Sequence, residues 1–386
     1  MKIDKAKLFE NFKNIKNFAN FHFLICYKNL FNTKGIITNI GCILLMIIIL
    51  FHIITIIIFC LNQFSSIYMK IRDITFGIFK YNLIEKKHKR KIKNLKSRVK
   101  KNGLFSGDSK KNMISDKIFN KKKLIKKKKH DKWKNKSLVT VNANNNIIID
   151  GKVKHILKYI DEEINLLPYN LAKEYDKRTF CPYYISLLKT KHSLLKTLFN
   201  NNDYNSRIIK FDLFLIGFAI DYIVNAFFYN DDTMHNIYES KGQFDLEAQI
   251  PIMVYSSLIT MVLNAPLEFL AFSNDSIIDF KQNKSTINLN KRKKNLKNIL
   301  KIKFILYFLI SFILLTFFWY YISIFCVIYR NTQIHLLKDT LMSFGLSLLF
   351  PFVIYLLPGL FRIPSLSNDK NNKECLYNFS KFLQTF

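Results

Sequence analysis

Hydrophobic residues gather into five long runs instead of recurring at regular helical or strand spacing. The first run, residues 35–61, contains no Asp, Glu, Lys or Arg. A helix needs about 20 apolar residues to cross roughly 30 Å of hydrocarbon, whereas buried core helices show shorter runs. The remaining runs cover residues 211–229, 250–272, 304–329 and 341–360. This pattern predicts an all-α membrane protein with about five transmembrane helices.

The last run differs from the others because it contains Pro351 and Pro358. Proline is tolerated in membrane spans when neighbouring helices or local adjustments satisfy the carbonyl groups that it leaves unpaired. We therefore expect residues 341–360 to form a span. A re-entrant hairpin is the alternative for this segment.

Charge distribution between the runs predicts the orientation. The segment after the second run is acidic, whereas residues 273–300 are rich in Lys and Arg. The acidic segment contains Asp231, Asp232, Glu239, Asp245 and Glu247, with Lys241 as its basic residue. Because short basic loops stay in the cytoplasm, we expect residues 273–300 there and the acidic segment on the opposite side.

Alternation of the spans then divides the chain into five parts. The predicted parts are a short lumenal or extracellular N-terminus (1–34), a first transmembrane helix (35–61), a cytoplasmic loop (62–207), a four-helix membrane region (208–361) and a cytoplasmic tail (362–386). The apolar runs predict an integral, multi-pass membrane location, and they do not distinguish plasma, ciliary and internal membranes. Whether Met1 is the true start or a larger ectodomain precedes it is left open.

Much of the net charge of +33 lies in the predicted cytoplasmic loop. So dense a like-charge block predicts disorder over residues 86–136. Seven lysines within residues 121–129 are candidate contacts to anionic lipid at the cytoplasmic face. They are Lys121, Lys122, Lys123, Lys126, Lys127, Lys128 and Lys129. A solvated linker is the main alternative, and nucleic-acid binding is less favoured.

Residues 153–200 show a helical rhythm that suits a folded part of the same loop. Within residues 183–199, apolar residues recur at a spacing of three to four, with lysines between them. This pattern predicts an amphipathic juxtamembrane helix that lies in the membrane interface. Packing of the same face under the helix bundle would give the same pattern.

Four polar residues within the second and third runs are candidate intramembrane contacts: Asp221, Asn225, Asn264 and Glu268. Ionisable residues inside a span are costly and usually face the bundle interior. One interpretation is an ion or proton path, for which two isolated acids at different depths are weak support. The favoured interpretation is a set of interhelical hydrogen bonds that fixes the packing of the two helices.

Motifs for catalysis are missing from the sequence, which has no phosphate loop, HExxH, GxSxG or CxxC. We therefore predict no catalytic residues and no cofactor. Asp231, Asp232 and His235 could form a calcium site, but no EF-hand loop or repeat supports it. The six cysteines have no spacing typical of zinc.

Several segments together resemble a known family: "LPYNLAKEYDKRTFCPYYISLLKTKHSLL" (167–195), "YNSRIIK" (204–210), "VNAFFYNDDTMHNIYESKGQFDLEAQIP" (224–251) and residues 317–366. They are similar to the C-terminal membrane region of a large family of multi-span transmembrane proteins of ciliates and related protists. Many members carry a long ectodomain upstream. The resemblance implies a membrane module and does not imply an activity.

A weaker resemblance, carried by Asn225, Ala226, Phe228 and Tyr229, is to the polycystin-1-type membrane region. This chain has a lysine tract where that type has a β-sandwich domain, and it ends before the channel-forming helices. The leading hypothesis is a non-enzymatic surface anchor or receptor-like membrane module. The alternative is an accessory subunit of a polycystin-like cation channel, with a membrane-protein partner.

Overall fold

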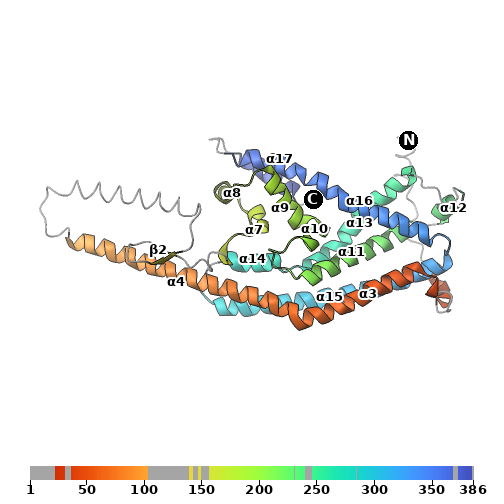
Figure 1. Cartoon of the computed structure of the whole chain (residues 1–386), viewed down its shortest axis with the longest axis horizontal. Helices are drawn as coiled ribbons and strands as arrows, with labels where there is room; N and C mark the ends of the chain where they lie inside the picture. Colours follow the sequence, from red (N-terminus) through yellow and green to blue (C-terminus); the bar gives the residue numbers. More distant parts are fainter. Residues whose placement is uncertain are drawn as a thin grey trace.

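The computed structural model shows an elongated helical protein with a bundle of long helices and a cap of short helices at one end (Figure 1). It describes residues 22–30, 36–102, 139–141, 147–148, 156–229, 231–239, 246–283, 285–367 and 373–384. Strands within these ranges are limited to β1 (Val139–Val141) and β2 (Ile147–Ile148), which pair antiparallel. The predicted all-α architecture is thus confirmed for the main body of the molecule.

Five long helices form the bundle. They are α3 (Ile40–Ile58), α11 (Arg207–Phe227), α13 (Leu246–Ala271), α15 (Leu289–Ile328) and α16 (Gln333–Ile354). Within the described residues, four segments are long and apolar enough to cross a membrane: Ile40–Asn62, Ile250–Ala271, Leu289–Ile328 and Gln333–Ser365. These four correspond to the predicted runs 35–61, 250–272, 304–329 and 341–360. Their outward faces carry large exposed apolar side chains such as Ile47, Val262 and Phe350, as expected for contact with lipid.

Helix α11, which corresponds to the run 211–229, has a different character. It contains Lys210, Asp212 and Asp221, and most of its residues are buried inside the molecule. It packs against α3, α13, α15 and α16. Because these neighbours shield it, α11 can carry charges that a lipid-facing helix would not tolerate.

Successive bundle helices run in opposite directions. At one end, which we call the α12 end, the Asn39 amide donates to the Ser323 carbonyl at 2.7 Å and the Gln333 amide donates to the Thr38 carbonyl at 3.2 Å. The start of α3, the end of α15 and the start of α16 therefore meet there. Helix α12 (Asp231–Glu239) and the 3-10 helix η1 (His22–Asn29) lie at the same end, on the right in Figure 1.

The opposite end is covered by the cap. It consists of α7 (Asp161–Leu166), α8 (Tyr169–Tyr175), α9 (Phe180–Lys191), α10 (Ser193–Leu198), α14 (Asn274–Gln282), α17 (Leu356–Ser365) and α18 (Glu374–Leu383). The short helices α7 to α10 agree with the helical rhythm expected for residues 153–200. The Tyr204 amide donates to the Asn274 side chain at 2.7 Å, so the start of α11 and the end of α13 meet at the cap.

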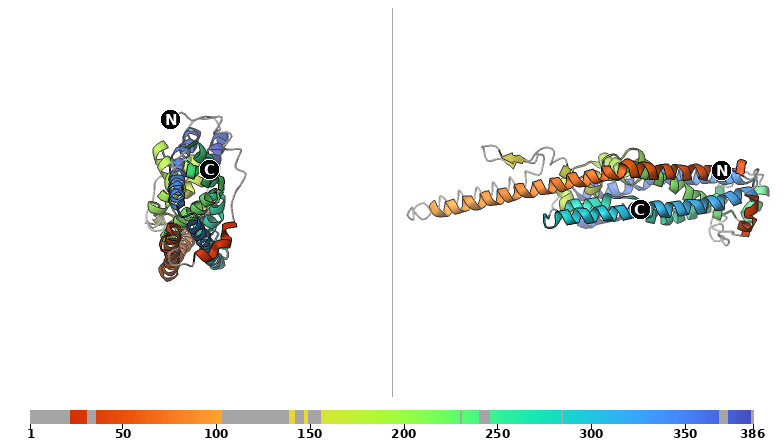
Figure 2. Two further views of the ribbon diagram at one scale, coloured as in Figure 1. Left: turned by 90° about the vertical axis from the view of Figure 1, so that its right-hand side faces the viewer. Right: turned by 90° about the horizontal axis from the view of Figure 1, so that it is seen from below.

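Residues 86–102 contradict the prediction of disorder over 86–136. Helix α3 continues through a π-helical turn, η2 (Phe59–Gln63), into α4 (Phe64–Asn102), which projects beyond the bundle as a single rod (Figure 2). Neither Gly nor Pro occurs between Gly77 and Gly103, and Lys, Arg, Leu and Ile are compatible with a helix. Lys89 pairs with Glu85 one turn earlier. Charge density alone therefore predicted the wrong state for residues 86–102.

The predicted amphipathic helix over residues 183–199 is also different from expectation. It is divided into α9 and α10 at His192, whose ring accepts from the Leu195 amide. Tyr183, Leu187 and Leu188 are buried against Tyr355, where α16 meets α17. These three residues are thus used for packing under the bundle, as the alternative interpretation of the pattern expects.

The segment with two prolines does not form a hairpin. Helix α16 includes Pro351 and passes at Tyr355 directly into α17, which includes Pro358. The continuous segment Gln333–Ser365 is long enough to cross a membrane. The helical path of residues 341–360 therefore favours a span over a re-entrant hairpin.

Candidate functional site

Asp221 lies at the centre of a junction between three bundle helices. It projects from α11 and is 2% exposed. From α13, the Ser256 and Thr260 hydroxyls donate to its Oδ1 atom at 3.2 and 3.3 Å. From α16, the Ser343 hydroxyl faces the same carboxylate. The interhelical contacts expected for Asp221 are therefore present, and they join α11 to α13.

One oxygen of this carboxylate accepts no hydrogen bond of standard geometry from the described residues, although the Ser343 hydroxyl lies near the carboxylate. Within the described part of the chain, neither Asp221 Oδ2 nor Ser343 Oγ makes a hydrogen bond, although both atoms are buried. Asn264 Oδ1, on α13, is buried and unpartnered in the same sense. Buried polar atoms normally have protein or water partners, so three such atoms together call for an occupant.

A polar cavity of about 140 Å³ is lined by Asp221 and Asn264. Its walls come from α11, α13, α16 and the α9–α10 segment. The deep part is lined by Asp221, Ser257, Thr260, Asn264 and Ser347, and the part near the cap by Lys191, Ser193, Lys196, Thr197, Lys210 and Glu268. A cavity of this size has room for several water molecules or a hydrated ion.

Glu268 lies at the cap end of the cavity. Lys210 also lines the cavity, but its ammonium donates to Asp203 at 3.0 Å and to the Asn200 carbonyl at 2.6 Å. Lys196 is the basic residue that interacts electrostatically with Glu268, and its ammonium lies 3.5 Å from the centre of the Phe272 ring. Burial lowers the pKa of Lys196, whereas Glu162 and Glu268 raise it.

The side-chain hydrogen bond of Asn225 stays within α11. Its side chain donates to the Asp221 carbonyl at 2.9 Å, one turn earlier in α11. Two residues after the end of the helix, the Tyr229 hydroxyl donates to Asp339 on α16. The segment with Asn225, Ala226, Phe228 and Tyr229 therefore closes the α12 end of α11.

Sequence analysis missed a second polar cluster in the bundle. His52 on α3 contacts Asp212 on α11 through Nδ1 at 2.9 Å, and the Tyr307 hydroxyl from α15 donates to the same carboxylate at 2.7 Å. The second ring nitrogen of His52 lies 3.3 Å from the Phe308 carbonyl. All three side chains are fully or almost fully buried. His52 within an otherwise charge-free run was the signal that could have indicated a buried partner.

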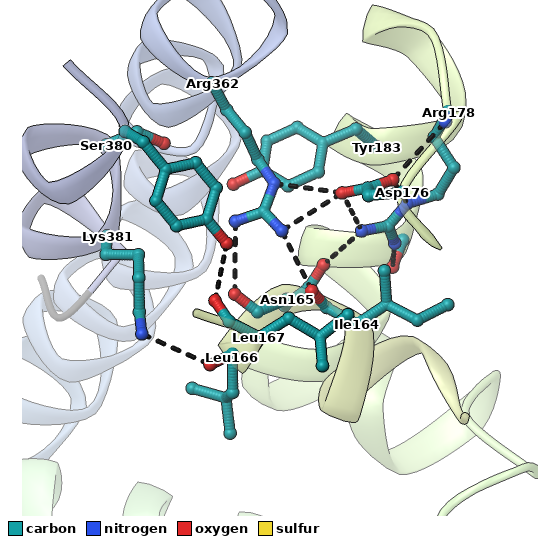
Figure 3. Close-up of polar contacts among 12 residues, drawn as sticks. Ile164, Asn165, Leu166, Leu167, Asp176, Arg178, Tyr183, Arg362, Ser380 and Lys381 are labelled. Atoms are coloured by element: carbon teal, nitrogen blue, oxygen red, sulfur yellow. Dashed lines mark hydrogen bonds and ion pairs between the residues drawn. The ribbon is translucent and has the colours of Figure 1, made fainter. Parts of the chain in front are cut away.

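Buried ion pairs hold the segments of the cap together. Arg362 on α17 is completely buried and contacts Asp176 Oδ2 through Nε at 3.0 Å, and Arg178 contacts Oδ1 of the same carboxylate at 2.8 Å (Figure 3). Arg362 also donates to the carbonyls of Ile164 and Asn165. Burial would raise the pKa of Asp176, but the two guanidinium groups lower it below its ordinary value.

A second pair joins α14 to α7. The Lys281 ammonium contacts Glu163 Oε2 at 2.6 Å and donates to the Lys158 carbonyl at 2.6 Å. Its third contact is the Tyr204 hydroxyl at 3.1 Å. Sequence analysis did not single out Lys281, Glu163, Asp176 or Arg362, because their partners are distant along the chain.

The acidic segment offers no complete metal site in the described ranges. His235 pairs with Glu239 at 3.1 Å within α12. No group of three His, Cys, Asp or Glu side chains converges anywhere in that part of the chain. The candidate lipid contacts Lys121, Lys122, Lys123, Lys126, Lys127, Lys128 and Lys129 lie outside the described residues.

Comparison of the chain with protein-family models, with curated proteins and with solved structures finds no match.

Proposed function

We propose that this chain is a five-span membrane module without catalytic activity, which serves as an anchor or receptor-like stem for a cytoplasmic cap. The observation that supports it best is the way the cap is attached. Buried Arg362 lies on α17, which continues α16, and forms an ion pair with Asp176 between α8 and α9. Buried Lys210 on α11 forms an ion pair with Asp203 in the segment that leads from α10 into the bundle. Such pairs hold the cap in one orientation relative to the bundle, because separating a buried pair leaves an uncompensated charge.

Counting α11 as the fifth span follows from its place in the bundle. It packs among the apolar helices and runs opposite to α13, as alternation requires. The first turns of α15 are basic, and they lie at the cap end, where Arg292 donates to the Phe280 carbonyl of α14. The preference of basic loops for the cytoplasm supports a cytoplasmic cap and an α12 end on the other side.

Glycosylation tests this orientation directly. The chain carries a natural acceptor sequence at Asn283, in the loop between α14 and α15. We expect Asn283 to remain unmodified, and we expect an acceptor inserted on a polar linker between residues 240 and 245 to be glycosylated in cells. Glycosylation at Asn283 but not at the inserted acceptor would invert the proposed orientation.

Anionic lipid at the cytoplasmic face remains the proposed partner of the seven lysines in residues 121–129. Each lysine close to such a surface contributes about 1 kcal/mol at low ionic strength. In nanodiscs, amine-labelling of this tract should fall when anionic lipid replaces neutral lipid. Equal labelling in both lipids would make the tract a solvated linker.

The second candidate is an accessory subunit of a cation channel, and the polar cavity beside Asp221 favours it. Cells that express the chain would then show a cation current that Asp221→Asn reduces. Absence of any such current leaves the anchor role as the better account.

A further inference from the structure

We propose that the deep part of the polar cavity binds a monovalent cation, with Asp221 as its anionic ligand. The inference rests on the helix bundle and goes beyond the anchor role. It begins with the carboxylate of Asp221, of which Oδ1 accepts two hydroxyl donors and Oδ2 accepts none within the described residues. An ionised carboxylate that is 2% exposed and only half satisfied needs a proton or a positive charge beside it.

The groups around the free oxygen are suited to a hard cation. The unpartnered atoms Asp221 Oδ2, Ser343 Oγ and Asn264 Oδ1 are all oxygens. The hydroxyls of Ser257 and Thr260 line the same cavity and retain lone pairs after they donate. Alkali and alkaline-earth cations prefer such carboxylate, carbonyl and hydroxyl oxygens, whereas transition metals prefer nitrogen and sulfur ligands.

The charge count favours a monovalent ion. Asp221 is the one acidic residue among those that line the deep part of the cavity. A single positive charge neutralises it, whereas a divalent ion would leave a net charge inside the bundle at a high desolvation cost. His52 contacts Asp212 on the opposite side of α11, so its ring is not available as a partner for Asp221.

The cavity gives the ion space and a direction of approach. Asn264 lies beside Gly217, one helical turn from Asp221 toward the cap, since a Cβ atom at Gly217 would lie 3.6 Å from its Nδ2 atom. One turn corresponds to about 5.4 Å, so an ion between Asp221 and Asn264 would keep part of its water. The cavity continues from there to Lys191, Lys196 and Glu268 beside the cap.

Lysines near the cap weaken the attraction of the cavity for cations without abolishing it. Lys210 is neutralised by Asp203, and Lys196 is attracted by Glu162 and Glu268. Lys191 is exposed, where solvent and salt screen its charge. Replacement of Lys196 by methionine should therefore tighten cation binding.

Radioactive sodium is the probe for the test, with the full chain purified in detergent or in nanodiscs. We expect saturable sodium binding, one ion per chain. Asp221→Asn should weaken the binding by about tenfold or more, which corresponds to about 1.4 kcal/mol. The matched control is Asp275→Asn on α14, outside the cavity, which should bind sodium as the original chain does. Binding that is unchanged in Asp221→Asn would overturn the proposal.

Gly217→Ala provides a second variant that is expected to fold. Alanine suits the helix, and its Cβ would be in ordinary contact with Asn264 while occupying the cavity. We expect weaker sodium binding with an unchanged thermal unfolding midpoint in sodium-free buffer. If the original chain binds no sodium at any accessible pH and its midpoint is the same in sodium, potassium and N-methylglucamine chloride, Asp221 is protonated and the proposal is wrong.

Failure of this test would leave the proposed orientation and anchor role untouched, because glycosylation reports on those separately.

Discussion

The two carboxylates of α11 lie on different sides of the same helix and have opposite environments. Asp212 faces α3 and α15, where His52 and Tyr307 occupy both of its oxygens. Asp221 faces α13 and α16, where one oxygen lacks a partner and a cavity adjoins it. The first cluster closes the packing of three helices. The second leaves a cavity beside the acid, and this is where we propose that a cation binds.

Helix α11 carries both of these carboxylates and a buried lysine. A helix with two buried acids and a lysine would be costly against lipid, and α11 avoids that cost because four other helices surround it. Each charge is then met by a different neighbour: Lys210 by Asp203, Asp212 by His52, and Asp221 by Ser256 and Thr260.

The largest expected effect is a difference in the free energy of unfolding between the Asp212→Asn and Asp221→Asn variants. Asp212→Asn removes the partner of His52, and breaking a buried pair costs about 3–5 kcal/mol. Asp221→Asn removes a half-satisfied charge, so in sodium-free buffer the free energy of unfolding should change by less than about 1 kcal/mol. Denaturant unfolding of both variants in detergent measures the difference. Equal losses would show that Asp221 is as closed a contact as Asp212.

A smaller effect is expected in the cap. Arg362→Met removes charge-assisted hydrogen bonds to Asp176. A hydrogen bond to a charged group contributes about 1.5–3 kcal/mol to stability. The loss should stay within that range because Arg178 still holds Asp176. Limited proteolysis of the segment between α7 and α9 should become faster. Arg330→Met, at an exposed position of the α12 end, is the control and should leave proteolysis unchanged.

The smallest effect concerns Lys196. Because burial lowers its pKa, the unfolded chain holds the Lys196 proton up to a higher pH than the folded chain. The charged form of Lys196 therefore lowers the free energy of unfolding. This loss is complete at any pH below the pKa of Lys196 in the folded chain. Lys196→Met should raise the free energy of unfolding by less than about 1 kcal/mol, because lost attraction to Glu162 and Glu268 offsets the gain. The difference between variant and original should shrink as the pH rises toward 10.5, and a constant difference would contradict this origin.

The hydrophobic pattern predicted which segments are helices more accurately than it predicted where those helices begin and end. The run 304–329 is the apolar part of α15, yet the helix begins at Leu289, because its first turns are basic and give no hydrophobic signal. Similarly, α4 continues to Asn102 through lysines that suit a helix but indicated disorder. Composition therefore reports which part of a helix faces lipid, and backbone propensity decides where it ends.

The candidate site was only partly predictable. Asp221, Asn264 and Glu268 were identified because polar residues in apolar runs are rare, and all three line one cavity. Ser343 gave no such signal, since hydroxyls are common in spans. The pairing of His52 with Asp212 and Tyr307 joins residues from three distant segments, and spacing along one chain does not report such contacts.

Access of water to Asn264 tests the contrast between the open and closed sides most directly. In a chain with Cys26, Cys60, Cys181 and Cys375 replaced by serine, Asn264→Cys should react with a membrane-impermeant thiol reagent. Reaction is expected from the cap side only and should be slowed by sodium. Ser311→Cys, buried beside Tyr307 in the closed cluster, should not react from either side. Reaction of both cysteines, of neither, or of Asn264→Cys from the α12 side would contradict a cavity that opens beside the cap.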